Sequence, residues 1–244
     1  MAFSRSAAFS VVVLLFGGIA DAQQSEPDLR VSFLIGSDYK HNGLSLTNSD
    51  PTLRLVTDYE HPSGFFAGGF LTNVDFAAEE YFRKPREIEA NLYAGYAWRG
   101  RNWATNVSVA RYLYPDLIIS YDYTQFAANF SFKDTYFFGV TRSTDYLSIY
   151  RDSYQYRGGI VLPTALNLEV GINAGRSSSS GILDIEYSFW DVGVSRAVGQ
   201  YALDLRYHGN DYDGTSLIGE SGSDRWVFSV AIAIVPRERR RVLR

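Results

Sequence analysis

Apolar and polar residues alternate in about a dozen short segments of this 244-residue chain, and no other feature limits the possible folds so strongly. A period of two residues is typical of a β-strand with one apolar and one polar face. In the clearest segment, Ile88 and Leu92 alternate with Glu89. The pattern predicts an all-β fold of twelve strands, at residues 29–37, 53–60, 66–76, 87–96, 103–112, 123–130, 136–140, 154–160, 166–173, 183–189, 201–208 and 226–234.

The connections between these segments are short and long in turn. Tight turns follow the even-numbered segments, and mostly longer polar stretches follow the odd-numbered ones, such as residues 77–86, 175–181 and 209–224. Short turns at one end and long loops at the other predict an antiparallel, up-and-down transmembrane β-barrel. The alternation slips near Trp190 and Asp191, which predicts a β-bulge. A soluble β-sandwich alternates as well, but its strands are shorter, usually about five to six residues.

Residues 1–22 have the features of a cleavable export signal. Arg5 supplies a positive charge, residues 7–20 are mostly apolar, and Ala20-Asp21-Ala22 matches an A-x-A cleavage site. A helix that spans a membrane needs about 20 apolar residues, and this apolar run is shorter, which disfavours a membrane anchor. The sequence therefore predicts three parts, namely a signal peptide at 1–22, the barrel at 23–235 and a basic periplasmic tail at 236–244.

Composition and charge agree with a barrel in a membrane. Aromatic residues make up 16% of the chain, and such barrels have aromatic girdles at both interfaces. The net charge is −4, and the tail alone contributes +4, which leaves −8 for residues 23–235 because Arg5 and Asp21 cancel. That negative charge argues against a nucleic-acid partner. The tail is either a solvated, disordered extension or a contact to an anionic surface.

The alternation also assigns charged side chains to the barrel interior. In a wide lumen they would line water and bias the passage of ions, whereas in a narrow lumen they would pair with one another and fill it. The sequence leaves both possibilities open. Replacing Leu92, on the apolar face, by Arg should destabilise the barrel, whereas Glu89→Arg should mainly alter ion selectivity. The pore-lining candidates are Arg30, Arg54, Asp58, Glu60, Glu87, Glu89, Arg157, Glu169, Asp184, Glu186, Asp204 and Arg206.

Residues for catalysis or metal binding are sparse. A serine hydrolase needs a histidine beside its nucleophile, and the chain has only His41 and His208, expected in outer positions, and His61, expected in a periplasmic turn. No histidine or cysteine cluster indicates zinc. A hard cation could be held by Asp211, Asp213 and Glu220, although a solvated loop is the simpler interpretation. We expect no cofactor and no catalytic residues.

Residues 37 to about 124 contain a series of short motifs in a fixed order. These are Ser37-Asp38-Tyr39 with Gly43 and Ser45, Asp58-Tyr59-Glu60, Ser63-Gly64-Phe65-Phe66-Ala67-Gly68, Asn73-Val74-Asp75-Phe76, Glu87-Ile88-Glu89, Tyr93-Ala94-Gly95-Tyr96 and Tyr112-Leu113-Tyr114-Pro115. In these motifs the chain resembles a proteobacterial family of outer-membrane porins, known as Gcw_chp or TorF-like. The resemblance implies a barrel and a channel, but it brings no substrate and no catalytic residue. The chain departs from the family pattern at Asn42, where the family usually has a basic residue.

Together these features predict a passive, mildly cation-preferring channel for small solutes or ions in the outer membrane of a Gram-negative bacterium. Its exterior would contact outer-membrane lipid, and the outer-membrane assembly machinery would insert it. A closed barrel that acts as an outer-surface binding or structural protein is the alternative. A lipid-modifying enzyme that uses His208 is a third possibility. The solute and the oligomeric state are not determined by the sequence.

Overall fold

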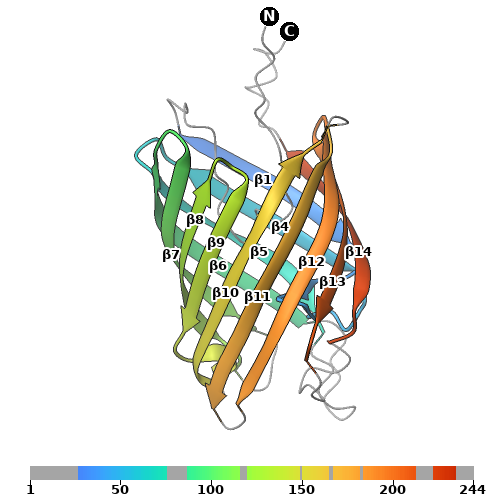
Figure 1. Cartoon of the computed structure of the whole chain (residues 1–244). Coiled ribbons are helices and arrows are strands. Elements are labelled where there is room, and N and C mark those ends of the chain that lie inside the picture. Colours follow the sequence, from blue (N-terminus) through green and yellow to red (C-terminus); the bar gives the residue numbers. More distant parts are fainter. Residues whose placement is uncertain are drawn as a thin grey trace, which may run out of the picture.

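The computed structural model describes residues 27–75, 87–115, 120–148, 150–164, 167–181, 184–212 and 222–234. Twelve antiparallel strands form a closed barrel, in which β1 pairs with both β4 and β14 (Figure 1). This confirms the predicted architecture. The barrel strands are β1 (Asp28–Gly36), β4 (Thr52–Glu60), β5 (Phe65–Val74), β6 (Glu87–Arg99), β7 (Trp103–Leu113), β8 (Tyr123–Phe132), β9 (Tyr136–Ser143), β10 (Tyr150–Pro163), β11 (Glu169–Gly181), β12 (Ile185–Val198), β13 (Tyr201–Asn210) and β14 (Arg225–Ile234).

The tight turns gather at the end of the barrel where β1 begins and β14 ends (Figure 1). The opposite end carries the connection between β1 and β4 and the short 3-10 helix η2 (Tyr146–Ser148). The predicted signal peptide, the tail and the loop at 77–86 lie outside the described residues. No helix among the described residues is long and apolar enough to cross a membrane.

The predicted loop at 175–181 is wrong, because these residues belong to β11. Strand pairing between β10 and β11 continues from Arg157↔Gly175 to Tyr150↔Gly181. Serine has little intrinsic preference for strands, but such preferences are weak beside a neighbouring strand that supplies the backbone partners. The connection between β11 and β12 is therefore much shorter than the sequence predicted.

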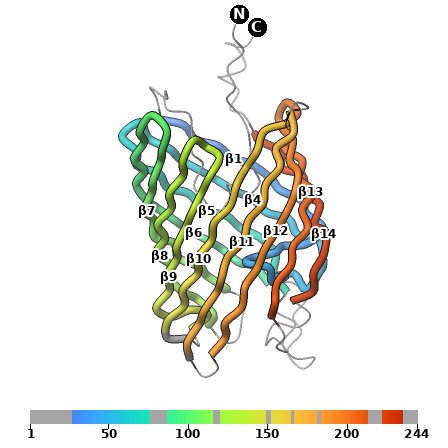
Figure 2. The backbone as a smooth tube through the Cα atoms, in the orientation of Figure 1, coloured from blue at the N-terminus to red at the C-terminus, as the bar shows by residue number. Residues whose placement is uncertain are grey.

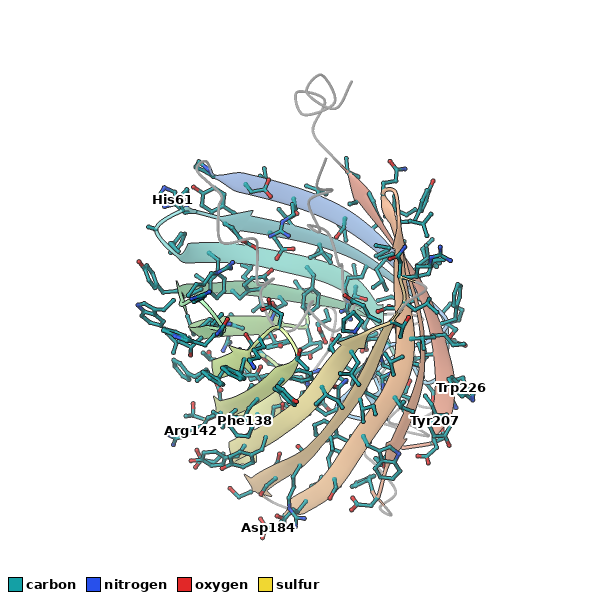
Figure 3. All side chains as sticks on the ribbon, turned by 45° about the horizontal axis from the view of Figure 1, so that its top comes forward. His61, Phe138, Arg142, Asp184, Tyr207 and Trp226 are labelled. Atoms are coloured by element: carbon teal, nitrogen blue, oxygen red, sulfur yellow. The ribbon has the colours of Figure 1, made fainter. Side chains whose placement is uncertain are left out.

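The exterior of the barrel is apolar and the interior is mostly polar. Leu92 on β6 is 61% exposed on the outside, whereas Glu89, on the opposite face of the same strand, is completely buried inside. Phe138, Tyr207 and Trp226 likewise point away from the barrel axis (Figure 3). This distribution is the reverse of a soluble protein and is typical of a barrel surrounded by lipid.

Two strands face the opposite way from the prediction. On β5, Phe66, Phe70 and Val74 are buried inside, while Phe65 and Leu71 are exposed outside. The sequence pattern misled because large apolar residues also fill the lumen. Phe70 and Val74 belong to an internal apolar cluster with Tyr39, Val56, Tyr112, Tyr114, Tyr123 and Leu147.

On β12 the same reversal removes the predicted bulge. Tyr187 and Phe189 face inward, in step with Asp191, and Trp190 faces outward. The pairing of β11 with β12 runs without interruption from Glu169↔Ser195 to Ser179↔Ile185. The slip in the sequence pattern therefore reflects inward-facing aromatic residues and not an extra residue in the strand.

The connection between β1 and β4 turns back into the barrel, and we call its residues 37–50 the inner segment. It contains the two short strands β2 (Lys40–His41) and β3 (Leu44–Ser45), which pair as a hairpin. In Figure 2 its blue tube lies within the outline of the barrel. Asn42 and Gly43 form the turn with φ values of 50° and 82°, as a two-residue hairpin turn of Asn-Gly requires. The inner segment narrows the lumen.

Candidate functional site

The inner segment is held together by one carboxylate and held to the barrel by another. Asp38 Oδ1 accepts hydrogen bonds from Ser45 Oγ at 2.6 Å and from Thr47 Oγ1 at 2.8 Å. The hydroxyl of Tyr39 donates to Glu89 Oε1 of β6 at 3.2 Å. The segment therefore has a defined internal geometry and a direct polar contact with the wall of the barrel.

Glu89 is the centre of a buried cluster. It accepts a second hydrogen bond from the hydroxyl of Tyr114, at 2.9 Å. The guanidinium carbon of Arg54 lies 4.0 Å from the centre of the Tyr39 ring and 4.6 Å from that of Phe70. A cation over an aromatic face is attracted by the ring, most strongly where water is excluded. These contacts hold the Tyr39 side chain of the inner segment against the wall of the barrel.

Strands β10 to β13 carry a network of paired charges, which we call the ion-paired wall and which consists of Arg157, Asn173, Asp191, Asp204 and Arg206. Asp191 binds Arg206 Nη1 at 2.5 Å and Arg157 Nη2 at 3.1 Å. Arg206 Nη2 also binds Asp204 at 3.1 Å, and Asn173 Nδ2 donates to Asp191 at 2.5 Å. The two arginines and two aspartates sum to zero charge, so this wall presents little net field to the lumen.

A second group of charges lies toward the tight-turn end. Arg30 forms ion pairs with Glu60 and, at 3.6 Å, with Asp28. Tyr93 donates a hydrogen bond to Asp58. The carboxylates outnumber the arginine here, so this part of the lumen is more acidic than the ion-paired wall.

Strands β6 to β10 form a different surface, which we call the amide wall and which consists of Asn91, Gln125, Asn129 and Gln155. All four side chains are buried and line an internal cavity of about 90 Å³. His41 and Asn42 of the inner segment close one side of the cavity, and among the described lining residues Arg157 is the one arginine. No carboxylate belongs to the described lining.

Ten of the twelve pore-lining candidates lie on the inward face of their strands. Two do not, and for these the prediction is wrong. Glu186 is exposed on the outside, where it pairs with Arg176 at 2.8 Å, and Asp184 is exposed at the barrel rim (Figure 3). The ten inward residues are Arg30, Arg54, Asp58, Glu60, Glu87, Glu89, Arg157, Glu169, Asp204 and Arg206.

Sequence reasoning missed several residues of the lumen. Asp191, which joins both arginines of the ion-paired wall, was hidden by the reversed facing of β12. The amides of the amide wall lay on faces predicted to be inward, but only charged residues were considered as candidates. The signal that could have found them is their repetition at inward positions of every second strand, namely β6, β8 and β10.

Two of the three histidines have a hydrogen-bond partner within their own segment. His41 lies in the connection between β1 and β4, the predicted outer loop, but this connection folds into the barrel, so His41 is buried and its Nε2 lies 3.1 Å from Asn42 Nδ2. His61 bonds to Ser63 within its own turn. Within the described ranges, no three His, Cys, Asp or Glu side chains are grouped to hold a metal. Asp213 and Glu220 lie outside those ranges, and Asp211 accepts a hydrogen bond from the Ser188 amide.

The fold and the lumen define a closed β-barrel with an apolar exterior and a polar, partly filled interior. Residues 22–235 match the family described as "Bacterial protein of unknown function (Gcw_chp)", and the chain belongs to that family. The Gcw_chp part of the predicted resemblance is thereby confirmed, while the TorF-like and porin character are not part of that description. No curated protein matches the chain.

Solved structures resemble this chain at low sequence identity. A membrane-protein chain from work on in-meso crystallization is 9% identical, with a TM-score of 0.50, over 84% of this chain and 83% of its own length. OccAB2 of Acinetobacter baumannii is 11% identical, with a TM-score of 0.45, over 88% of this chain and 66% of its own length. The outer membrane protein OprD from Pseudomonas aeruginosa is 11% identical, with a TM-score of 0.40, over 86% of this chain and 65% of its own length. This chain spans about two thirds of the length of the latter two.

Proposed function

We propose that the protein is a passive channel in the outer membrane of a Gram-negative bacterium, through which small solutes or ions cross the barrel lumen. The observation that carries the proposal is the inverted distribution of side chains, apolar outside and polar inside a closed sheet. A closed sheet satisfies every strand hydrogen bond without water, so it can cross hydrocarbon. Lipid would contact the exterior, residues 1–22 would direct export, and the assembly machinery would insert the barrel.

A mild preference for cations is the finer part of the proposal. It is supported by an excess of carboxylates over arginines among the inward-facing residues of the barrel strands. Fixed charges in a pore bias which ions enter it. The inward carboxylates of the strands include Asp28, Asp58, Glu60, Glu87, Glu89, Glu169, Asp191 and Asp204, against the arginines Arg30, Arg54, Arg99, Arg157, Arg206 and Arg225.

Reversal potentials in a salt gradient test both parts. The mature protein is reconstituted into a planar bilayer, and the current is recorded with unequal KCl on the two sides. We expect discrete conductance steps and a reversal potential displaced toward that of K⁺. A lack of conductance would contradict the channel, and a displacement toward Cl⁻ would contradict the cation preference alone.

A closed barrel that binds a ligand or serves a structural role is the second candidate. The observation that favours it is the filling of the lumen, since the inner segment, the internal apolar cluster and the ion pairs leave a cavity of about 90 Å³. Swelling of proteoliposomes in isosmotic glycerol separates the two, because only a channel raises the swelling rate above that of protein-free liposomes.

A further inference from the structure

We propose that the cavity beside the amide wall is a binding site for a small uncharged polyol, of about the size of glycerol. This deepens the proposed function by naming the class of solute, and it rests on that function where transport is concerned. The lining is dominated by neutral amides and hydroxyls, with aromatic rings beside them. Such a mixture of a few fixed polar groups and apolar surface is typical of small-molecule sites.

Size limits the ligand. The cavity volume of about 90 Å³ is the space open to the centre of a water-sized sphere. One water molecule needs roughly 10–15 Å³ of such space, so the cavity has room for several waters or one small organic molecule. The rings of Phe66 and Phe70 lie on one side and the amides of Gln125 and Asn129 on another. A polyol has both kinds of surface, because its C–H groups pack against rings and its hydroxyls bind amides.

Charge argues against an ionic ligand. The lining contains no carboxylate among the described residues, and the charge of its arginine, Arg157, is balanced by Asp191 at 3.1 Å. The pKa of His41 is lowered to about 4, chiefly by burial, so its imidazole is neutral near pH 7. An ion moved into this cavity would lose its hydration without a counter-charge, which is strongly unfavourable.

Three residues of the lining have a buried nitrogen without a hydrogen-bond partner among the described residues. These atoms are Nδ1 of His41, Nδ2 of Asn91 and Nε of Arg157. Because Asn42 donates to Nε2 of the neutral His41, its Nδ1 carries the hydrogen and is a donor as well. Unpaired buried donors are unfavourable, so this part of the barrel has polar groups that the described residues leave unsatisfied.

Binding is measured directly, without relying on conductance. Saturation-transfer difference NMR is recorded for glycerol with the purified protein in detergent micelles, with empty micelles as the blank. We expect a signal from the C–H protons of glycerol. In Asn91→Leu, which keeps the branched shape and the number of side-chain heavy atoms but removes the amide, the dissociation constant should rise about 2- to 10-fold, as for the loss of one neutral hydrogen bond.

Two further variants guard against a merely structural effect. Gln125→Met changes a second lining residue and should weaken glycerol binding as Asn91→Leu does. Thr72→Val removes a buried hydroxyl that bonds to Thr52 at 3.0 Å outside the cavity, and it should leave binding unchanged. Asn91→Leu should also unfold at the same or a higher temperature than the wild type, because an unpaired buried donor is removed.

The possible failures are distinct. A signal no larger than that of empty micelles, equal binding by wild type and Asn91→Leu, or tighter binding of glycerate than of glycerol would overturn the site. Ion conductance without glycerol binding would overturn the site and leave the channel intact. Glycerol binding without conductance or swelling would keep the site and overturn the channel.

Discussion

The ion-paired wall and the amide wall face the same lumen but satisfy their polar groups in different ways. On the ion-paired wall, Asp191 accepts from Arg157, Arg206 and Asn173 at 2.5 to 3.1 Å. On the amide wall, Asn91 has a buried nitrogen without a partner in the described structure. The difference indicates that the first wall keeps the barrel closed and rigid, whereas the second retains polar groups for a solute.

Removing the centre of the ion-paired wall should have the largest effect. Asp191→Leu leaves Arg157 and Arg206 buried with one lost partner each, and such uncompensated charges cost about 3–5 kcal/mol. Urea unfolding in lipid vesicles measures the free energy of unfolding. Asp191→Asn, which keeps the shape, should be less harmful. A loss under about 1 kcal/mol for the leucine variant, as for an exposed pair, would show that the wall is not structural.

The exterior provides the next largest change. Leu92→Arg puts a charge on the lipid side and should lower the free energy of unfolding by about 2–4 kcal/mol. Leu92→Phe is the apolar control and should be nearly neutral. If the two variants unfold alike, the outward face of β6 is not in lipid. The expectation that Glu89→Arg mainly changes selectivity is revised, because Glu89 is fully buried and bonded to two tyrosines.

The contact between the inner segment and the wall should have a moderate effect. Tyr39→Phe removes the hydroxyl that donates to Glu89, a loss of about 1 kcal/mol. Because Tyr39 belongs to the inner segment, we expect faster trypsin cleavage after Lys40 and more frequent conductance steps. Tyr114→Phe removes the other hydrogen bond to Glu89 but lies outside the segment, so cleavage should stay slow. Equal cleavage of both variants would argue against this contact as the anchor.

Acid should produce the smallest change, again through the inner segment. The pKa of His41 is lowered from 6.5 to about 4 by burial and by the nearby Arg157 and Arg54. Folding thus favours the neutral imidazole, so its contribution is complete above pH 6.5 and is lost as the pH falls toward 4. The protein is exposed to acid in a lipid that slows refolding, returned to neutral pH and then treated with trypsin. The fraction that resists trypsin should decrease as the pH of the acid step falls from 6.5 to 4. A His41→Gln variant with the same pH dependence would contradict this role.

Much of the fold could be predicted from the sequence, because the period of two residues follows directly from strand geometry. Leu92 and Glu89 were assigned to the correct faces in this way. The method failed on β5 and β12, where Phe70 and Phe189 fill the lumen. Alternation shows which residues share a face, but when both faces contain large apolar residues it does not show which face is inside.

The candidate site was less predictable. Charged residues such as Arg206 and Asp204 were found because a buried charge has few plausible places in a barrel. The inner segment was not predicted, since its path depends on contacts with distant strands, such as that of Tyr39 with Glu89. Neutral amides such as Asn91 carry no charge signal, and their grouping around one cavity appears only when five neighbouring strands are placed side by side.

The most direct test is the single-channel conductance of the barrel with and without the hairpin of the inner segment. Residues 39–46 are replaced by a short glycine–serine link, and folding is checked by β-sheet circular dichroism. We predict small steps for the wild type and clearly larger steps for the shortened chain, because the hairpin narrows the lumen through which solutes pass. A folded barrel that stays silent in both forms, or steps of equal size, would contradict passage through this lumen.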